Sequence, residues 1–292
     1  MRKIVRLVAR TGCRTHILHV SSGLSVDVLR RAKAEGLPVS AETCPHYLTL
    51  DCDHIPDNAT AVKCCPPIRD LHEQDALWAG LADGTLDGVV TDHSPASADM
   101  KAGTLATAWG GVSSLQVGFR AVLTGAMRRG LSLADVVRWM SCNTARLVGL
   151  DDRGDITPVL RADLAIIRPY ERFVVDATAL ESRNPICACD GMTLNGVVRR
   201  TFVEGRDVLS GVRARRSTST LRPLDTCRIC VRQPVRATSR TILRTAFASH
   251  SAGRDAAFNS VRNSRGFCCR VSRPFRWFGT VSSMPNPPDM RC

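Results

Sequence analysis

Apolar and polar positions recur along the first third of the chain with two periods, that of an α-helix and that of a β-strand. Apolar residues spaced three and four apart predict amphipathic helices, and short runs rich in Val, Ile and Thr predict strands. In chain order, the pattern predicts a helix over 2–10, a strand over 15–20, a helix that Ser25 caps and that ends at Gly36, a strand over 38–43, a strand over 61–65, a helix over 70–82 and a strand over 87–91.

This alternation of strands and helices is typical of an α/β protein with a parallel sheet and helices packed outside it. Four such units in a row predict part of a (β/α)8 barrel, namely its second half. A glycine-rich loop over 101–111 follows, then helices near 112–127 and 133–147. Further strands are expected over 162–167 and 197–203, with a small β element at Arg206-Asp207, and we expect them to be the remnant of a small β-sandwich.

Charge divides the chain near Gly211. Residues 1–211 hold 24 basic and 24 acidic side chains, whereas residues 212–292 hold 16 Arg, no Lys and three Asp, so the excess of +13 lies in the last part. We therefore expect a half-barrel over 1–150, the β-rich remnant over 151–211 and a basic, disordered tail over 212–292. An Arg-rich tail can bind nucleic acid through phosphates. The complete lack of Lys and Glu favours translation in a shifted reading frame instead, and nucleic acid is not an expected partner.

Three features of the sequence indicate the cellular compartment of the protein. No apolar run reaches the ~18 residues that a membrane helix needs. The opening residues carry Arg and Lys within their apolar stretch, unlike a secretory signal. The 13 cysteines are dispersed over a long chain, which favours free thiols in a reducing compartment. We expect a cytoplasmic protein with no membrane partner.

Three polar side chains follow successive predicted strands: His19, His46 and Asp92. In barrels the reactive groups lie at the carboxyl ends of the strands, so these three should share one rim. Alone, each residue has an ordinary structural explanation, a satisfied histidine or a turn-capping aspartate. Together, two imidazoles and a carboxylate suit a divalent metal such as Zn²⁺.

Five motifs occur in a fixed order: HILHVSS, AETCPHYLTL, KCCPPIRD, VVTDHSP and AWGGVSSLQ. In this order and spacing, residues 1 to about 211 resemble the cyclic amidohydrolases. Among these, the pairing of ETCPHY and PPIR with DHSP and AWGG is more similar to the allantoinases than to the dihydropyrimidinases (hydantoinases) or dihydroorotases.

The resemblance implies a two-metal hydrolase that cleaves a C–N bond in a cyclic amide or ureide. His19 matches the family's fifth-strand ligand, His46 the sixth and Asp92 the eighth; Asp92 would also take a proton from the attacking water and pass it to the leaving nitrogen. The resemblance implies homo-oligomers as well. The residues matching the family's substrate-holding loops are Cys65, Pro66, His93, Ser94, Gly110 and Gly111.

The chain departs from the family pattern in its metal ligands. None of its seven histidines forms the family's HxH pair, and none of its four lysines lies where the bridging lysine belongs. With three of six ligands, we expect a truncated, impaired enzyme that holds at most one metal weakly. A separate chain that supplies the other half-barrel is one alternative, since the outer strands around Ile17 and Val89 would be open edges. A non-catalytic fragment with a nucleic-acid-binding tail is another.

Overall fold

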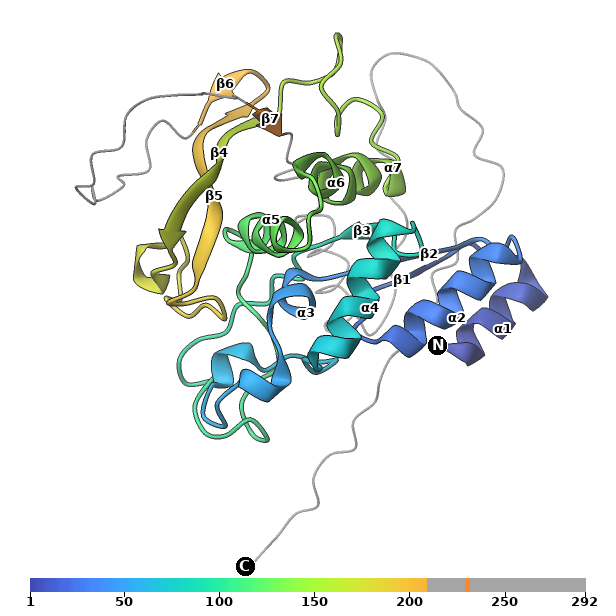
Figure 1. The fold of residues 1–292 in the computed structure, drawn as a ribbon, viewed down its shortest axis with the longest axis horizontal. Helices are drawn as coiled ribbons and strands as arrows, with labels where there is room; N and C mark the ends of the chain where they lie inside the picture. The colour runs from blue at the N-terminus through green and yellow to red at the C-terminus, as the bar shows by residue number, and fades with distance from the viewer. Residues whose placement is uncertain (209–228, 232–292) are drawn as a thin grey trace, which may run out of the picture. The chain divides into compact units, whose positions relative to one another are not determined.

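The computed structural model describes residues 1–208 and 229–231 (Figure 1). The expected basic tail over 212–292 lies outside the described residues, except for the three residues of one short strand. In the described part, no helix is both long enough and apolar enough to span a membrane.

A three-stranded parallel sheet lies within the first half of the described chain. Its strands, in the spatial order β1-β2-β3, are β1 (Thr15–Ile17), β2 (Val39–Thr43) and β3 (Gly88–Val89). The pairing aligns Thr15 with Val39 and Thr43 with Val89. Both connections cross over through helices, as parallel strands require. The predicted α/β class with a parallel sheet is confirmed.

The helices around this sheet begin and end at clear local signals. Gly12 ends the first helix in the left-handed conformation, with φ 64°, which glycine adopts without strain. Asp70 caps its helix by accepting a hydrogen bond from the N–H of Glu73. The helices of this part are α1 (Arg2–Thr11), α2 (Gly23–Ala34), α3 (Pro45–Thr49), α4 (Leu71–Ala82) and the 3₁₀ turns η1 (Cys52–His54) and η2 (Thr60–Val62).

Two expectations about these elements are wrong. The cap of α2 is Ser22 rather than Ser25, because the helix begins three residues earlier and the Ser22 hydroxyl accepts from the N–H of Ser25. Residues 61–65 form no strand. The free edge of β2 is occupied by β3, and the backbone of Lys63 pairs with Gly111 in a loop instead. The described sheet therefore has three parallel strands, and Asp92 follows the third.

The main core lies between the parallel sheet and its helices. Leu29 of α2, Leu81 of α4 and Ala41 of β2 are fully buried there, together with Trp139. Alternate β2 residues Ser40 and Glu42 lie on the other face of the sheet, because neighbouring residues of a strand point to opposite sides. The helices that continue this layer are α5 (Gly118–Arg128), α6 (Leu133–Val137), the π-helical turn η3 (Arg138–Cys142) and α7 (Asn143–Leu147).

A four-stranded antiparallel sheet completes the described residues, in the order β6-β5-β4-β7 (Figure 1). Gly196 has φ +92°, and a Cβ there would lie 2.8 Å from Leu123 of α5, so only glycine allows this close approach of strand and helix. The predicted strands near 162–167 and 197–203 and at Arg206-Asp207 are present. The elements of this sheet are β4 (Leu164–Val174), η4 (Ala177–Ala179), β5 (Thr193–Val203), β6 (Arg206–Asp207) and β7 (Ile229–Val231).

Candidate functional site

The carboxyl ends of the three parallel strands carry the side chains that the sequence singled out. His19 follows β1, His46 follows β2 and Asp92 follows β3. His19 and Asp92 both have positive φ, 39° and 44°. Non-glycine residues rarely adopt this conformation, and where they do the site is often functional. We call this edge, defined by His19, Cys44, His46 and Asp92, the rim.

His46 is the most unusual side chain of the rim. It is only 2% exposed, and neither ring nitrogen has a hydrogen-bond partner among the described residues. Burial, with a smaller contribution from the charge of His19, lowers its pKa to about 4. The ring is therefore neutral at physiological pH and has one nitrogen lone pair to offer. An orphaned, buried imidazole is costly unless something binds it.

Asp92 and Cys44 lie beside His46. One ligand atom from each of the three residues lies within 4.8 Å of the other two. Asp92 is exposed, whereas Cys44 is fully buried. Burial, and then the nearby carboxylates of Asp92 and Glu42, hold the pKa of the Cys44 thiol well above its usual range. These donors fit a metal ion, because they combine sulfur, nitrogen and oxygen atoms with an unpartnered imidazole.

His19 lies near the same place but outside this close group. Its charge affects the pKa of His46, so the two imidazoles are neighbours. His19, His46 and Asp92 together do not form a group in which all ligand atoms lie within 4.8 Å, whereas Cys44, His46 and Asp92 do. Sequence reasoning did not select Cys44. The Cys44-x-His46 spacing was the available signal.

The hydrogen bonds of His93 define which of its ring nitrogens carries the proton. Its Nδ1 accepts hydrogen bonds from the backbone N–H groups of Ser114, at 3.1 Å, and Leu115, at 3.2 Å. Burial lowers its pKa. A neutral ring that accepts at Nδ1 carries its proton on Nε2. His93 can therefore act as a hydrogen-bond donor beside Asp92.

The two loops expected to hold a substrate are joined by a buried lysine. The ammonium of Lys101 donates to the backbone carbonyls of Trp109, at 2.9 Å, and Gly111, at 2.7 Å, and more weakly to that of Lys63, at 3.3 Å. The N–H of Gly111 donates to the carbonyl of Lys63 at 2.8 Å. Lys101 was not predicted, because a lysine within a glycine-rich loop usually lies in solvent.

The remaining predicted residues lie around these loops. Pro66 follows Cys65 through a cis peptide bond, and its carbonyl accepts from the hydroxyl of Tyr47 at 2.8 Å. The Ser94 N–H donates to the carbonyl of Val112 at 3.0 Å. A Cβ on Gly111 would lie 2.8 Å from the Ser94 carbonyl oxygen, so Gly111 and Ser94 are in close contact. Cys65 is exposed, whereas Gly110 is half-buried.

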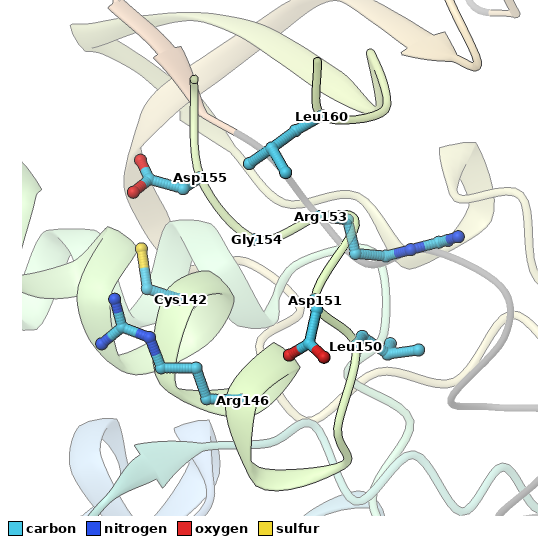
Figure 2. Close-up of a pocket in the computed structure, with 8 residues that line it drawn as sticks. All are labelled: Cys142, Arg146, Leu150, Asp151, Arg153, Gly154, Asp155 and Leu160. Atoms are coloured by element: carbon cyan, nitrogen blue, oxygen red, sulfur yellow. The ribbon is translucent and has the colours of Figure 1, made fainter. Parts of the chain in front are cut away.

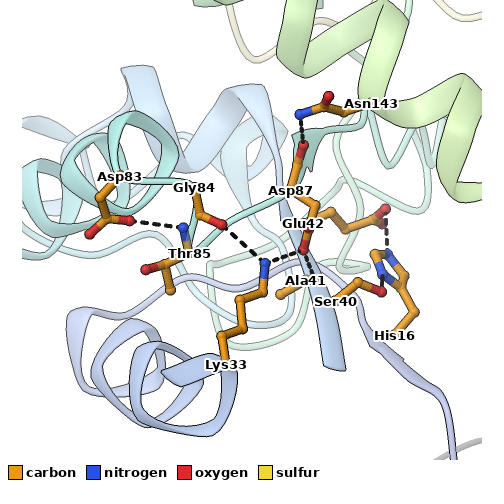
Figure 3. A network of polar contacts seen from close by, with 10 residues as sticks. All are labelled: His16, Lys33, Ser40, Ala41, Glu42, Asp83, Gly84, Thr85, Asp87 and Asn143. Carbon is orange, nitrogen blue, oxygen red and sulfur yellow. Dashed lines mark hydrogen bonds and ion pairs between the residues drawn. The ribbon is translucent and has the colours of Figure 1, made fainter. Parts of the chain in front are cut away.

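Another histidine, His16, is fully satisfied and lies within β1. Its ring bonds Ser40, at 2.8 Å through Nδ1, and the carboxylate of Glu42, at 2.9 Å through Nε2 (Figure 3). A histidine held on both sides in this way serves the structure of the sheet. The contrast with His46 shows which histidine is free to bind something.

A separate cavity of about 220 Å³ lies between the end of α7 and the loop after it (Figure 2). It contains none of the rim residues. Its lining is formed by Cys142, Arg146, Leu150, Asp151, Arg153, Gly154, Asp155 and Leu160.

Comparison with known proteins places this geometry in a family context. The model of the Amidohydrolase family matches residues 4–208. An allantoinase of Streptomyces avermitilis is 53% identical over 201 residues, which cover 69% of this chain and 45% of that protein. An allantoinase of Escherichia coli K12 is 38% identical over 206 residues, covering 70% and 46%.

Solved structures of hydantoinases and dihydropyrimidinases also match the chain. The L-hydantoinase (dihydropyrimidinase) of Arthrobacter aurescens superposes with a TM-score of 0.66 at 28% identity, covering 72% of this chain and 48% of that one. The dihydropyrimidinase of Brevibacillus agri gives 0.67 at 25% identity, covering 71% and 47%. The chain spans about half the length of the relatives it matches.

Proposed function

The chain belongs to the amidohydrolase family, and from this premise we propose that it is part of a metal-dependent hydrolase that opens a cyclic ureide by cleaving a C–N bond. Allantoin is the proposed substrate, because the Streptomyces relative at 53% identity is an allantoinase. The hydantoinases and dihydropyrimidinases among the structural relatives make hydantoin-type rings the second choice. The observation that carries the proposal is the buried, unpartnered imidazole of His46 beside Asp92.

The metal of this proposal is a divalent ion, and zinc is the favoured one. The buried nitrogen of His46 and the carboxylate of Asp92 would hold it; His19 is a neighbour of His46 but lies outside the group whose ligand atoms are within 4.8 Å of one another. Imidazole and carboxylate ligands are typical of catalytic zinc sites. Such an ion supplies Lewis-acid polarisation of a carbonyl and lowers the pKa of water.

The chain's own residues would orient the ring and move the proton. Asp92 is exposed, so its carboxylate can accept a proton from the attacking water and deliver it to the leaving ring nitrogen. His93, with its proton on Nε2, can donate a hydrogen bond to a developing negative charge on oxygen. The backbone near Cys65–Pro66 and Gly110–Gly111, tied together through Lys101, would hold the polar edge of the ring.

Low activity of the isolated chain is part of the proposal. The sequence lacks an HxH pair and a lysine matching the family's bridging residue, so a dinuclear centre would need further ligands. In the described sheet, β1 and β3 each pair on one side only. Such edges favour pairing with further strands. A second chain that carries the first half of the barrel would fit there, as would assembly into a homo-oligomer. A cytoplasmic location remains a prediction from the dispersed cysteines.

An assay of the purified full chain with Zn²⁺ tests this function. Allantoin, hydantoin and dihydroorotate are offered in parallel, with and without a co-expressed amino-terminal half of the Streptomyces relative. We expect slow hydrolysis of allantoin, faster when the second chain is present, and loss of both in Asp92→Asn. Hydrolysis that survives Asp92→Asn, or no hydrolysis of any ring with the partner half present, would contradict the proposal.

The alternative of a non-catalytic nucleic-acid-binding fragment has no support from the comparisons, which match enzymes of the amidohydrolase family. The Arg-rich segment on which that alternative depends lies almost wholly outside the described residues.

A further inference from the structure

We propose that Cys44 is a metal ligand, so that the rim binds one divalent ion through the sulfur of Cys44, a ring nitrogen of His46 and a carboxylate oxygen of Asp92. The inference rests on the metal-binding part of the proposed function and adds a ligand that the family pattern did not supply. These three ligands all come from the described residues, and none of them belongs to an HxH pair or is a bridging lysine.

The positions of the three ligand atoms carry this inference. They lie within 4.8 Å of one another. Ligand atoms around a tetrahedral zinc ion lie about 3.3–3.8 Å apart, given bond lengths of about 2.0–2.3 Å. A contraction of at most about 1.5 Å in any pair would therefore close the site, and the exposed side chain of Asp92 has room to move towards the buried Cys44 and His46. Three protein ligands and one open position are typical of catalytic zinc sites.

The buried members of the group have no hydrogen-bond partner in the described residues. Both nitrogens of His46 lack partners, although the side chain is almost completely enclosed. No hydrogen bond of the Cys44 sulfur is present within the described part of the chain either, and its side chain is fully buried. The imidazole of His46 and the thiol of Cys44 thus lie beside the same carboxylate without hydrogen-bond partners. This is the arrangement expected of metal ligands in the absence of the ion.

Charge balance favours the thiol over a second imidazole. When a divalent ion binds, a sulfur–metal bond forms and the thiol proton leaves to solvent. A thiolate and a carboxylate then cancel the two positive charges, and the neutral imidazole adds none. A set of two imidazoles and one carboxylate would leave one positive charge uncompensated at a largely buried place, which is costly. A thiolate also selects zinc or cobalt over magnesium or calcium.

Titration of the full chain with Co²⁺ under reducing conditions tests the ligand assignment by absorption spectroscopy. A thiolate bound to cobalt gives a sulfur-to-cobalt charge-transfer band in the near ultraviolet, and a tetrahedral site gives strong visible bands. We expect both at one equivalent. Cys44→Ser and Cys44→Ala should remove the charge-transfer band and weaken Co²⁺ binding at least tenfold. Circular dichroism establishes that each variant is folded, and the serine variant keeps the size of the side chain.

The matched control is Cys64→Ala, since Cys64 lies near Cys44 and Tyr47 and is a free thiol as well. It should leave the bands unchanged. A charge-transfer band that persists in both Cys44 variants overturns the inference, as does Co²⁺ binding with visible bands but no sulfur band. In the latter case the metal site at His46 and Asp92 still stands. Failure to bind Co²⁺ at all overturns both this inference and the metal site of the proposed function.

Discussion

The two ends of the parallel sheet differ in whether their buried polar groups have hydrogen-bond partners. At the amino end of β3, the carboxylate of Asp87 accepts from the ammonium of Lys33 and from the buried N–H of Ala41, each at 2.8 Å (Figure 3). The Asp87 carbonyl accepts from the side chain of Asn143 at 2.7 Å. At the carboxyl end, the imidazole of His46 is buried with no partner among the described residues.

This difference assigns stability to the amino end of the sheet and function to its carboxyl end. Polar groups at the amino end are paired in the folded chain, so they stabilise it without any ligand. At the rim, the buried imidazole of His46 is left unsatisfied, so it weakens the metal-free chain and becomes favourable only when something binds. The carboxyl end of a barrel's strands is where reactive groups belong, and the amino end contributes to stability.

The largest change in the free energy of unfolding should come from the amino end. Asp87→Ala leaves the N–H of Ala41 without its acceptor and removes the ion pair of Lys33, whose ammonium keeps its bond to the Gly84 carbonyl, at an expected cost of about 2–4 kcal/mol. Chemical denaturation followed by circular dichroism measures it. Asp87→Asn, which keeps an acceptor oxygen but loses the charge, should lose about half as much. Equal stability of Asp87→Ala and the unchanged chain would mean that the amino end is not the stabilising one.

The loop beside the rim offers a pair of adjacent glycines that should respond differently. At Gly111 a Cβ would lie 2.6 Å from the hydroxyl and 2.8 Å from the carbonyl oxygen of Ser94, whereas at Gly110 the nearest atoms lie 3.9 Å away. We expect Gly111→Ala to cost about 1–3 kcal/mol through overpacking. Gly110→Ala should leave the midpoint of denaturation almost unchanged. Similar losses in both variants would show that the loop is not packed as described.

His46→Leu should stabilise the metal-free chain. Replacing a buried, unpartnered imidazole with an apolar side chain of similar size removes a desolvation cost, so we expect a gain of about 1–2 kcal/mol in the free energy of unfolding. His16→Leu is the matched control. It breaks the bonds to Ser40 and Glu42, and it should destabilise the chain. A loss of stability in His46→Leu, measured without metal, would mean that His46 has a partner in solution.

The smallest effect concerns the cap of α2. Ser22→Ala should cost about 0.5–1 kcal/mol, because it removes the acceptor for the N–H of Ser25. Ser25→Ala should cost less, since Ser25 lies inside the helix. Thermal denaturation of both variants compares them. The reverse order would restore the cap that the sequence pattern predicted.

Much of the fold could be predicted because local signals agree with it. The apolar spacing of α4 and the Asp70 cap that precedes it define a helix in sequence and in structure alike. The strand expected over 61–65 failed because extended propensity does not reveal whether a sheet edge is free, and here β3 fills the edge of β2.

The site was only partly predictable for related reasons. His46 and Asp92 follow strands, so topology alone brought them together. Cys44 was missed because a free cysteine at the end of a predicted strand is usually a small hydrophobic core residue. Lys101 was missed because its partners are backbone carbonyls, which no side-chain pattern encodes.

Thermal denaturation of the full chain across a range of Zn²⁺ concentrations tests most directly whether the rim is a metal site. An ion that binds only the folded chain stabilises it by about 2.7 kcal/mol at one hundred times its dissociation constant. We predict a midpoint that rises with Zn²⁺ in the unchanged chain and in Asp87→Asn, but stays flat in Asp92→Asn and His46→Leu. A midpoint that does not respond to Zn²⁺, or that rises equally in the two rim variants, would contradict the account.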